Sequence, residues 1–133
     1  LLVSLAACGS SKQKDNTSEN AKSAELNIEE ARGTLLNLAK FFASPEVAGR
    51  RWRIEGHTDN RPVSASSIYP SNWELSAARA ANVLHYLADF GVDEKQFSIA
   101  GYADTRPKLS NDTAEGRAYN RRVDVIVLDD GHF

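Results

Sequence analysis

The chain has 133 residues, of which 41% are hydrophobic and 26% charged, which suits one globular domain with a single core. Its formal net charge is -2, whereas nucleic-acid-binding proteins usually carry a strongly basic face, so a nucleic-acid partner is not expected. Its single cysteine, Cys8, excludes an internal disulfide and a cysteine-based metal cage. No motif for a metal or another cofactor stands out, and none is expected.

The first eight residues, LLVSLAAC, form a short apolar run that ends in two alanines and Cys8. A membrane-spanning helix needs about 20 residues, so we interpret residues 1–8 as the remnant of a signal peptide. The stretch Leu5–Cys8 resembles the lipobox of bacterial lipoproteins, in which the cysteine is acylated. The chain opens on Leu and contains no Met, which suggests that its first residues are absent. The alternative is an apolar fragment start with a free cysteine.

Residues 9–22 are rich in Ser, Lys, Asn, Asp, Glu and Gln and show no periodic apolar positions. Such a composition cannot bury enough surface to offset the entropy lost on ordering, so we expect a disordered polar tether. The folded domain is then expected to cover residues 23–133.

Two elements are predicted in the first half of the domain. Asn27, followed by Glu30, is typical of a helix N-cap, and Ser44–Pro45 ends the helix. Its apolar positions recur at helical spacing: Ile28, Ala31, Leu35, Leu38 and Phe42. In residues 50–57 apolar and charged residues alternate, which predicts a half-buried strand with its basic side chains facing water or a rim.

The second half repeats the alternation of helix and strand. Ser71 and Glu74 form a capping box that opens a helix ending at Gly91. Residues 96–104 predict a strand, Asp112 caps a short helix to Asn120, and residues 121–128 predict a last strand. This order favours an α/β sandwich with its helices on one face of the sheet.

Polar residues gather where these strands end and helices begin, the places where ligands tend to bind in layered folds. Asp59 offers an anion, and the cations are Arg79, Arg117, Arg121 and Arg122. A ligand with both an ammonium and a carboxylate group would suit such a set. Taken singly, Asp59 is as well explained by an Asx-turn, and each arginine by a solvated face or a strand edge.

Four motifs in register carry a resemblance to a known family: IEGHTDN, SNWELSAARAANVL, IAGYADTRP and NDTAEGRAYNRRVDVIVL. Together they resemble the OmpA-like peptidoglycan-binding domain, most closely the type found in MotB flagellar stator proteins. The resemblance covers residues 23–128. It implies an α+β two-layer sandwich with helices packed on one face of a small mixed sheet, and non-catalytic binding of peptidoglycan.

The resemblance also implies a role for each matching residue toward the diaminopimelate of the cell-wall stem peptide. Asp59, in the TD step with Thr58, is expected to bind the ammonium group, and Arg79 the carboxylate. The residues expected to line or brace the pocket are Thr58, Asn72, Leu75, Asn120 and Arg121. The distal end of diaminopimelate is itself an amino acid, which agrees with the need for one fixed anion and one fixed cation.

Family members usually open with an apolar strand directly before the segment SAEL, which is Ser23–Leu26 here. The residues before it are polar, so we expect the first strand to be missing and the sheet to have three strands. Gly9 follows Cys8 in place of an Asp, which resembles the signal-free case of lipoproteins that are sorted to the outer membrane. The expected location is therefore the cell envelope, with a periplasmic domain tethered to the membrane through lipidated Cys8.

Several alternatives remain. The domain could anchor a flagellar motor stator to the cell wall, as in the MotB type. It could be an enzyme that uses His57 and Asp59, although His85 and His132 offer no evident third metal ligand. It could also contact another envelope or motor protein through the apolar residues Ile68 and Tyr69 of the 61–70 loop, although an ordinary mobile loop is the alternative there. It could also form a homodimer, although no heptad pattern predicts one.

Overall fold

The computed structural model describes residues 2–6 and 28–128 of the chain. Cys8, the tether at 9–22 and the predicted cap Asn27 lie outside the described residues. The elements are β1 (Leu2–Ala6), α2 (Ile28–Phe42), the 3-10 helix η1 (Pro45–Val47), β2 (Arg51–His57), α3 (Asn72–Asp89), the 3-10 helix η2 (Glu94–Gln96), β3 (Phe97–Gly101), α4 (Ala114–Asn120) and β4 (Arg122–Leu128).

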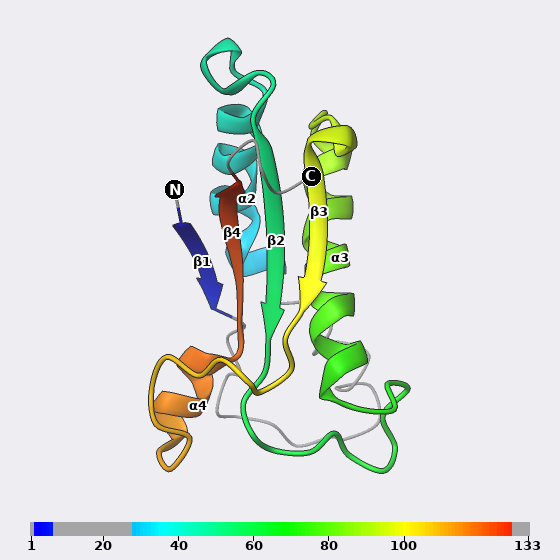
Figure 1. Cartoon of the computed structure of the whole chain (residues 1–133), viewed down its shortest axis with the longest axis vertical. Coiled ribbons are helices and arrows are strands. Elements are labelled where there is room, and N and C mark those ends of the chain that lie inside the picture. The colour runs from blue at the N-terminus through cyan, green and yellow to red at the C-terminus, as the bar shows by residue number, and fades with distance from the viewer. Residues whose placement is uncertain (1, 7–27, 129–133) are drawn as a thin grey trace.

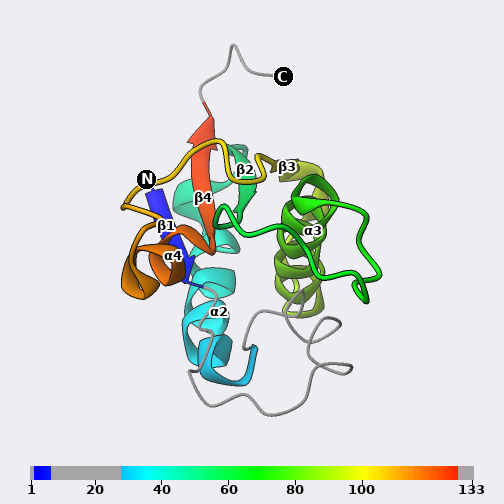
Figure 2. The same ribbon diagram turned by 90° about the horizontal axis from the view of Figure 1, so that it is seen from below.

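The described strands form one mixed sheet in the order β1-β4-β2-β3. β2 pairs in parallel with β3 and antiparallel with β4, which also pairs antiparallel with β1. Helices α2 and α3 cover the same face of this sheet, and α4 lies at its lower end in the view of Figure 1. Figure 2 shows the two long helices side by side on that face. The predicted two-layer sandwich is therefore confirmed.

The expectation of a missing first strand was wrong. Leu2–Ala6 forms β1, and its register with β4 runs from Leu2 opposite Ile126 to Ala6 opposite Arg122. The strand was sought directly before the first helix, whereas residues 7–27 separate it from α2. A short apolar run is consistent with a strand as well as with a leader segment. The interpretation of residues 1–8 as a signal remnant did not include a strand, and the lipidation of Cys8 stays a prediction.

Helix α3 begins as predicted. Ser71 is its N-cap; the Ser71 hydroxyl accepts from the Trp73 N–H and donates to the Glu74 carboxylate, which lowers the pKa of Glu74. The helix ends before Gly91, whose φ of 97° lies in the left-handed region that glycine tolerates.

Helix α4 differs from the prediction, since its N-cap is Thr113 and not Asp112. The Thr113 hydroxyl accepts the Gly116 N–H at 2.9 Å, and this bond places the start of the helix one residue later.

The core lies between the sheet and the two long helices. Val123 and Val125 of β4 are almost fully buried, as are Ile54 of β2 and Leu87 of α3. Phe42 of α2 packs edge-on against both Trp52 and Phe97, with ring centroids 4.8 and 5.2 Å apart.

Within the part of the chain that the structure describes, no helix has the length and apolar character to cross a membrane.

Candidate functional site

The candidate site begins where β2 ends. Thr58 donates its backbone N–H to Ala103 O at 2.9 Å, so the segment that follows β2 stays attached to the segment that follows β3. Asp59 comes next and is only 6% exposed. Its Oδ1 accepts the Arg61 N–H at 2.9 Å, which closes the Asx-turn expected of an Asp after a strand. Its Oδ2 accepts from Arg121 Nη1 at 2.7 Å. Asp59 is thus both a turn residue and part of a charged site.

Arg79 reaches the same place from the inner face of α3. The side chain is buried, with 4% exposure for the residue, and Nη1 lies 3.4 Å from His57 O. Burial lowers the pKa of Arg79 to about 10; the neighbouring Arg121 adds to this effect, and Asp59 opposes it. The guanidinium therefore stays charged at neutral pH. The reading of Arg79 as a solvated surface residue is excluded.

Two glycines let α3 lie directly on the sheet at this point. A Cβ on Gly56 would stand 1.8 Å from Ser76 O, and one on Gly101 would stand 2.7 Å from Ala77 N. Ser76 between them is fully buried, and its hydroxyl accepts the Ala103 N–H at 3.1 Å. Arg79 lies one helical turn after Ser76. The glycines therefore set how closely Arg79 approaches the end of β2.

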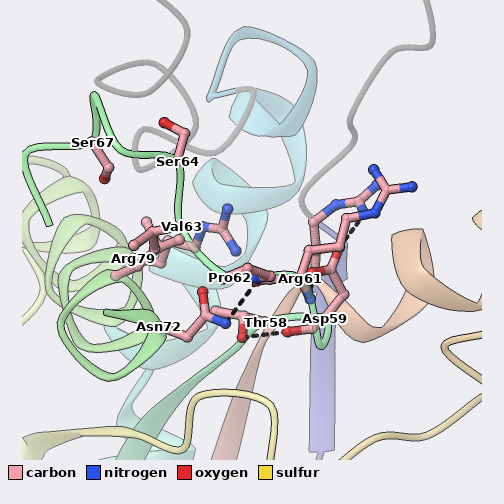
Figure 3. Close-up of a pocket in the computed structure, with 11 residues that line it drawn as sticks. Thr58, Asp59, Arg61, Pro62, Val63, Ser64, Ser67, Asn72 and Arg79 are labelled. Atoms are coloured by element: carbon pink, nitrogen blue, oxygen red, sulfur yellow. Dashed lines mark hydrogen bonds and ion pairs between the residues drawn. The ribbon is translucent and has the colours of Figure 1, made fainter. Parts of the chain in front are cut away.

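A cavity of about 240 Å³ lies between the end of β2, the 61–70 loop and the start of α3 (Figure 3). The residues that line it are Thr58, Asp59, Arg61, Pro62, Val63, Ser64, Ser67, Asn72, Leu75, Arg79 and Arg121. Six of the seven residues predicted to bind the ligand are among them. The structure thus brings the predicted anion and the predicted cation to one cavity.

The seventh predicted residue, Asn120, does not line this cavity. It is fully buried, and its Oδ1 accepts the backbone N–H groups of Lys108 and Leu109 at 2.8 and 3.0 Å. Its Nδ2 donates to Leu109 O and to Asn111 Oδ1. Asn120 therefore braces the loop before α4. Arg117 braces the same loop, since its Nη1 donates to Asn111 O at 2.8 Å.

Sequence reasoning missed one wall of the cavity. The 61–70 loop contributes Arg61 and the four residues Pro62, Val63, Ser64 and Ser67. Asn72 fixes this loop, because its Nδ2 donates to Arg61 O at 2.9 Å. The available signal was that this loop joins two predicted site segments, since it starts directly after Asp59 and ends at the capping box of Ser71.

A second cluster of charges lies on the sheet face opposite the helices. Glu55, His57, Arg122 and Asp124 are each no more than 3% exposed there, and Glu55 and His57 face Asp124 and Arg122 in the strand register. Tyr102 covers the cluster: its ring stacks on His57 and its hydroxyl donates to Glu55 at 3.0 Å. Arg122 Nε donates to Asp124 Oδ2 at 3.0 Å. Arg122 thus belongs to this cluster and does not line the ligand cavity.

His57 belongs to the second cluster and not to the cavity. Its Nε2 lies 3.5 Å from Asp124 Oδ2, and neither ring nitrogen has a hydrogen-bond partner among the described residues. Burial, and secondarily Arg122, lowers the pKa of His57 to about 4, so the imidazole is neutral at pH 7. His57 and Asp59 therefore form no acid-base pair in this structure. The described residues also contain no group of three or more His, Cys, Asp or Glu side chains that could hold a metal ion.

Comparison with known proteins identifies the family. The OmpA family model matches residues 10–121, which is most of the chain. The chain belongs to the OmpA family. Among the relatives of this OmpA-family chain, Motility protein B of Bacillus subtilis is 48% identical over 79 residues, which is 59% of this chain and 30% of the relative. Peptidoglycan-binding protein ArfA of Mycobacterium bovis is 40% identical over 88 residues, covering 66% of this chain and 24% of the relative.

Solved structures agree with the family assignment. The periplasmic domain of Helicobacter pylori MotB superposes with a TM-score of 0.70 at 29% identity, covering 79% of this chain and 65% of that chain. The cell wall anchor of the type VI secretion system of Pseudomonas aeruginosa gives a TM-score of 0.69 at 32% identity, covering 97% of this chain and 81% of that chain. This OmpA-family chain spans only about a third of the length of the sequence relatives that it matches.

Proposed function

We propose that this OmpA-family domain binds peptidoglycan without catalysis, by holding the diaminopimelate of the stem peptide. One observation carries the proposal: the carboxylate of Asp59 and the guanidinium of Arg79, twenty positions apart in the chain, line the same cavity. Binding needs no activated nucleophile or metal-bound water, and the charges in the cavity suit recognition of a zwitterion.

In this proposal the ammonium group of the distal diaminopimelate centre binds Asp59. The Asp59 carboxylate can accept this further hydrogen bond, because it has acceptor sites beyond those used by Arg121 and the Arg61 N–H. The distal carboxylate of the ligand binds Arg79, whose planar guanidinium suits bidentate contact. Thr58, Asn72 and Leu75 shape the cavity around the ligand, Arg121 orients Asp59, and Asn120 acts through the loop that it braces.

The proposed cellular role is to tether a membrane or an envelope complex to the cell wall. The relatives include one protein named as peptidoglycan-binding and one structure described as a cell wall anchor, which supports this role. The second candidate is the wall-anchoring domain of a MotB-type motor stator, which is supported by the 48% identity to Motility protein B. In either case we place the domain in the periplasm, with lipidated Cys8 as the proposed membrane anchor in the first.

A protein partner is a further part of the proposal. Ile68, at 70% exposure, projects from the 61–70 loop, and Tyr69 beside it is half-buried. An envelope or motor protein is the proposed occupant of that apolar spot, and a homodimer is a separate proposal. Wall binding and such a contact can occur together.

The test is co-sedimentation with purified diaminopimelate-type peptidoglycan. We expect Asp59→Ala and Arg79→Ala each to weaken binding at least about tenfold, since each leaves a desolvated charge without its partner. Matched controls are Asp89→Ala at the far end of α3 and Arg32→Ala on α2, which remove the same charges from exposed positions. Retention of both site variants at the wild-type level would reject the site.

Lysine-type peptidoglycan separates diaminopimelate recognition from general wall binding. Lysine keeps the distal ammonium group but lacks the distal carboxylate, so it cannot engage Arg79. We expect weaker binding of the wild-type protein to this polymer and no further loss in Arg79→Ala. Equal binding to both polymers would reject the role of diaminopimelate while leaving wall binding in place.

A further inference from the structure

The charges that line the cavity do not balance. The lining residues include three arginines, Arg61, Arg79 and Arg121, but one acidic residue, Asp59, which is an excess of two positive charges. Glu74, on the first turn of α3, does not line the cavity, and its carboxylate accepts from the Ser71 hydroxyl in the capping box. The ligand is therefore expected to carry net negative charge.

Asp59 is already compensated within the protein. Arg121 Nη1 lies 2.7 Å from Asp59 Oδ2, and the side chains of this pair are 24% and 8% exposed, respectively. A single zwitterionic centre bound at Asp59 and Arg79 brings no net charge with it. The excess of two positive charges would remain after such a ligand bound.

Arg61 is held at the rim of the cavity by two residues of the proposed site. Its backbone N–H donates to Asp59 Oδ1 at 2.9 Å, and its carbonyl accepts from Asn72 Nδ2, also at 2.9 Å. The start of its side chain is therefore fixed relative to the binding groups, although the residue is exposed. A planar guanidinium on a side chain that starts beside the cavity suits a carboxylate.

We infer that Arg61 forms a subsite for a second carboxylate of the bound stem peptide. This inference rests on the proposed function, because it assigns the distal diaminopimelate centre to Asp59 and Arg79. Two groups of the same peptide supply the chemistry: the α-carboxylate of the γ-linked glutamate and the main-chain carboxylate of the diaminopimelate. The domain then distinguishes stem peptides with free carboxylates from those in which the carboxylate has been amidated.

The test uses three synthetic tripeptides of alanine, γ-linked glutamate and diaminopimelate. One has all its carboxylates free, the second carries an amide on the glutamate, and the third carries an amide on the main-chain carboxylate of diaminopimelate. Calorimetry at low ionic strength gives Kd for the wild-type protein, for Arg61→Gln and for Arg50→Gln. Arg50 is an exposed arginine before the start of β2, at the opposite end of that strand, and its replacement changes the net charge equally.

We expect one of the two amidations to weaken binding about two- to fivefold in the wild-type protein and in Arg50→Gln, as for an exposed ion pair. The same amidation should have no effect in Arg61→Gln, whose affinity for the free peptide should already be lower by that factor. The amidation that has the effect identifies which carboxylate Arg61 binds.

Two results would overturn the inference in different ways. If the wild-type protein binds all three peptides equally, or if an amidation weakens wild-type and Arg61→Gln alike, Arg61 binds no second carboxylate while the proposed function stands. If the wild-type protein does not bind the free peptide at all, the proposed function fails and the inference fails with it. Thermal unfolding of each variant checks that folding is intact.

Discussion

Replacing Gly56 by alanine is the sharpest test of how the fold places Arg79. The new Cβ would lie 1.8 Å from Ser76 O and 2.7 Å from Ser76 C, both of them backbone atoms that cannot rotate away. Real Cβ atoms essentially never approach closer than 3.0 Å, so α3 and β2 must separate by more than 1 Å. Arg79 is carried on the next turn of α3 and must move with it.

The expected loss of stability follows from two opposing terms. Overpacking of this kind costs about 1–3 kcal/mol, and replacing a strand glycine by alanine returns roughly 0.5–1 kcal/mol of chain entropy. We therefore expect the free energy of unfolding to fall by about 1–2 kcal/mol. Binding of peptidoglycan should weaken about tenfold or more, because the hydrogen bonds proposed between Arg79 and the ligand carboxylate weaken steeply with distance and angle.

The assay is urea unfolding followed by circular dichroism, with peptidoglycan binding measured well below the unfolding midpoint. Gly33→Ala is the matched control: it lies in the middle of α2, is exposed, and has nothing within 4 Å of the added Cβ. This control should stabilise the protein by roughly 0.5–1 kcal/mol and leave binding unchanged. Wild-type stability and affinity in Gly56→Ala would refute the close contact of α3 with β2.

Two further predictions concern groups outside the cavity. Burial lowers the pKa of His57 to about 4, whereas the pKa in the unfolded chain is about 6.5. The neutral imidazole therefore contributes up to about 3 kcal/mol to the free energy of unfolding above pH 6.5, and this contribution is lost as the pH falls from 6.5 to 4. In His57→Gln the free energy of unfolding should depend less on pH between pH 4 and 7 than in the wild-type protein. The control His85→Gln, at an exposed position, should keep the wild-type dependence. An unchanged pH dependence in His57→Gln would contradict the assignment. Asn120→Ala leaves the N–H groups of Lys108 and Leu109 without their acceptor, and we expect a loss of about 2–3 kcal/mol in urea unfolding; a loss below about 0.5 kcal/mol would show that the loop does not depend on Asn120.

Local sequence patterns predicted the helices and strands whose bounds depend on neighbouring residues. The capping box of Ser71 and Glu74 fixes the start of α3, and alternating apolar residues predicted β2 and β4, because burial of one face leaves a period of two in the sequence. β1 was missed since its apolar run carries no such period and pairs with β4, the strand farthest from it in the chain. The position of β1 in the sheet depends on a long-range contact with β4, and the residues next to β1 in the sequence do not indicate it.

The resemblance located the cavity better than it located the role of each residue. Asp59, Arg79 and four others meet there, but Asn120 turned out to brace a loop. Arg61 was missed, because its position depends on how Asn72 holds the 61–70 loop. The role of a residue in a loop is set by the groups that hold the loop, and these are distant in sequence.

The end of β2 explains why charge alone could not separate binding residues from structural ones. Glu55, His57 and Asp59 follow one another at alternate positions, yet Glu55 and His57 face the cluster under Tyr102 while Asp59 faces the cavity. The strand pairing ends at His57, and the backbone of Thr58 then bonds to Ala103, so the alternation no longer decides where Asp59 points. His57 joins the two sites, since its carbonyl contacts Arg79 while its ring packs on Tyr102. The cluster under Tyr102 therefore borders the residue whose carbonyl contacts Arg79, and a change in the cluster is expected to reach Arg79 through the backbone of His57.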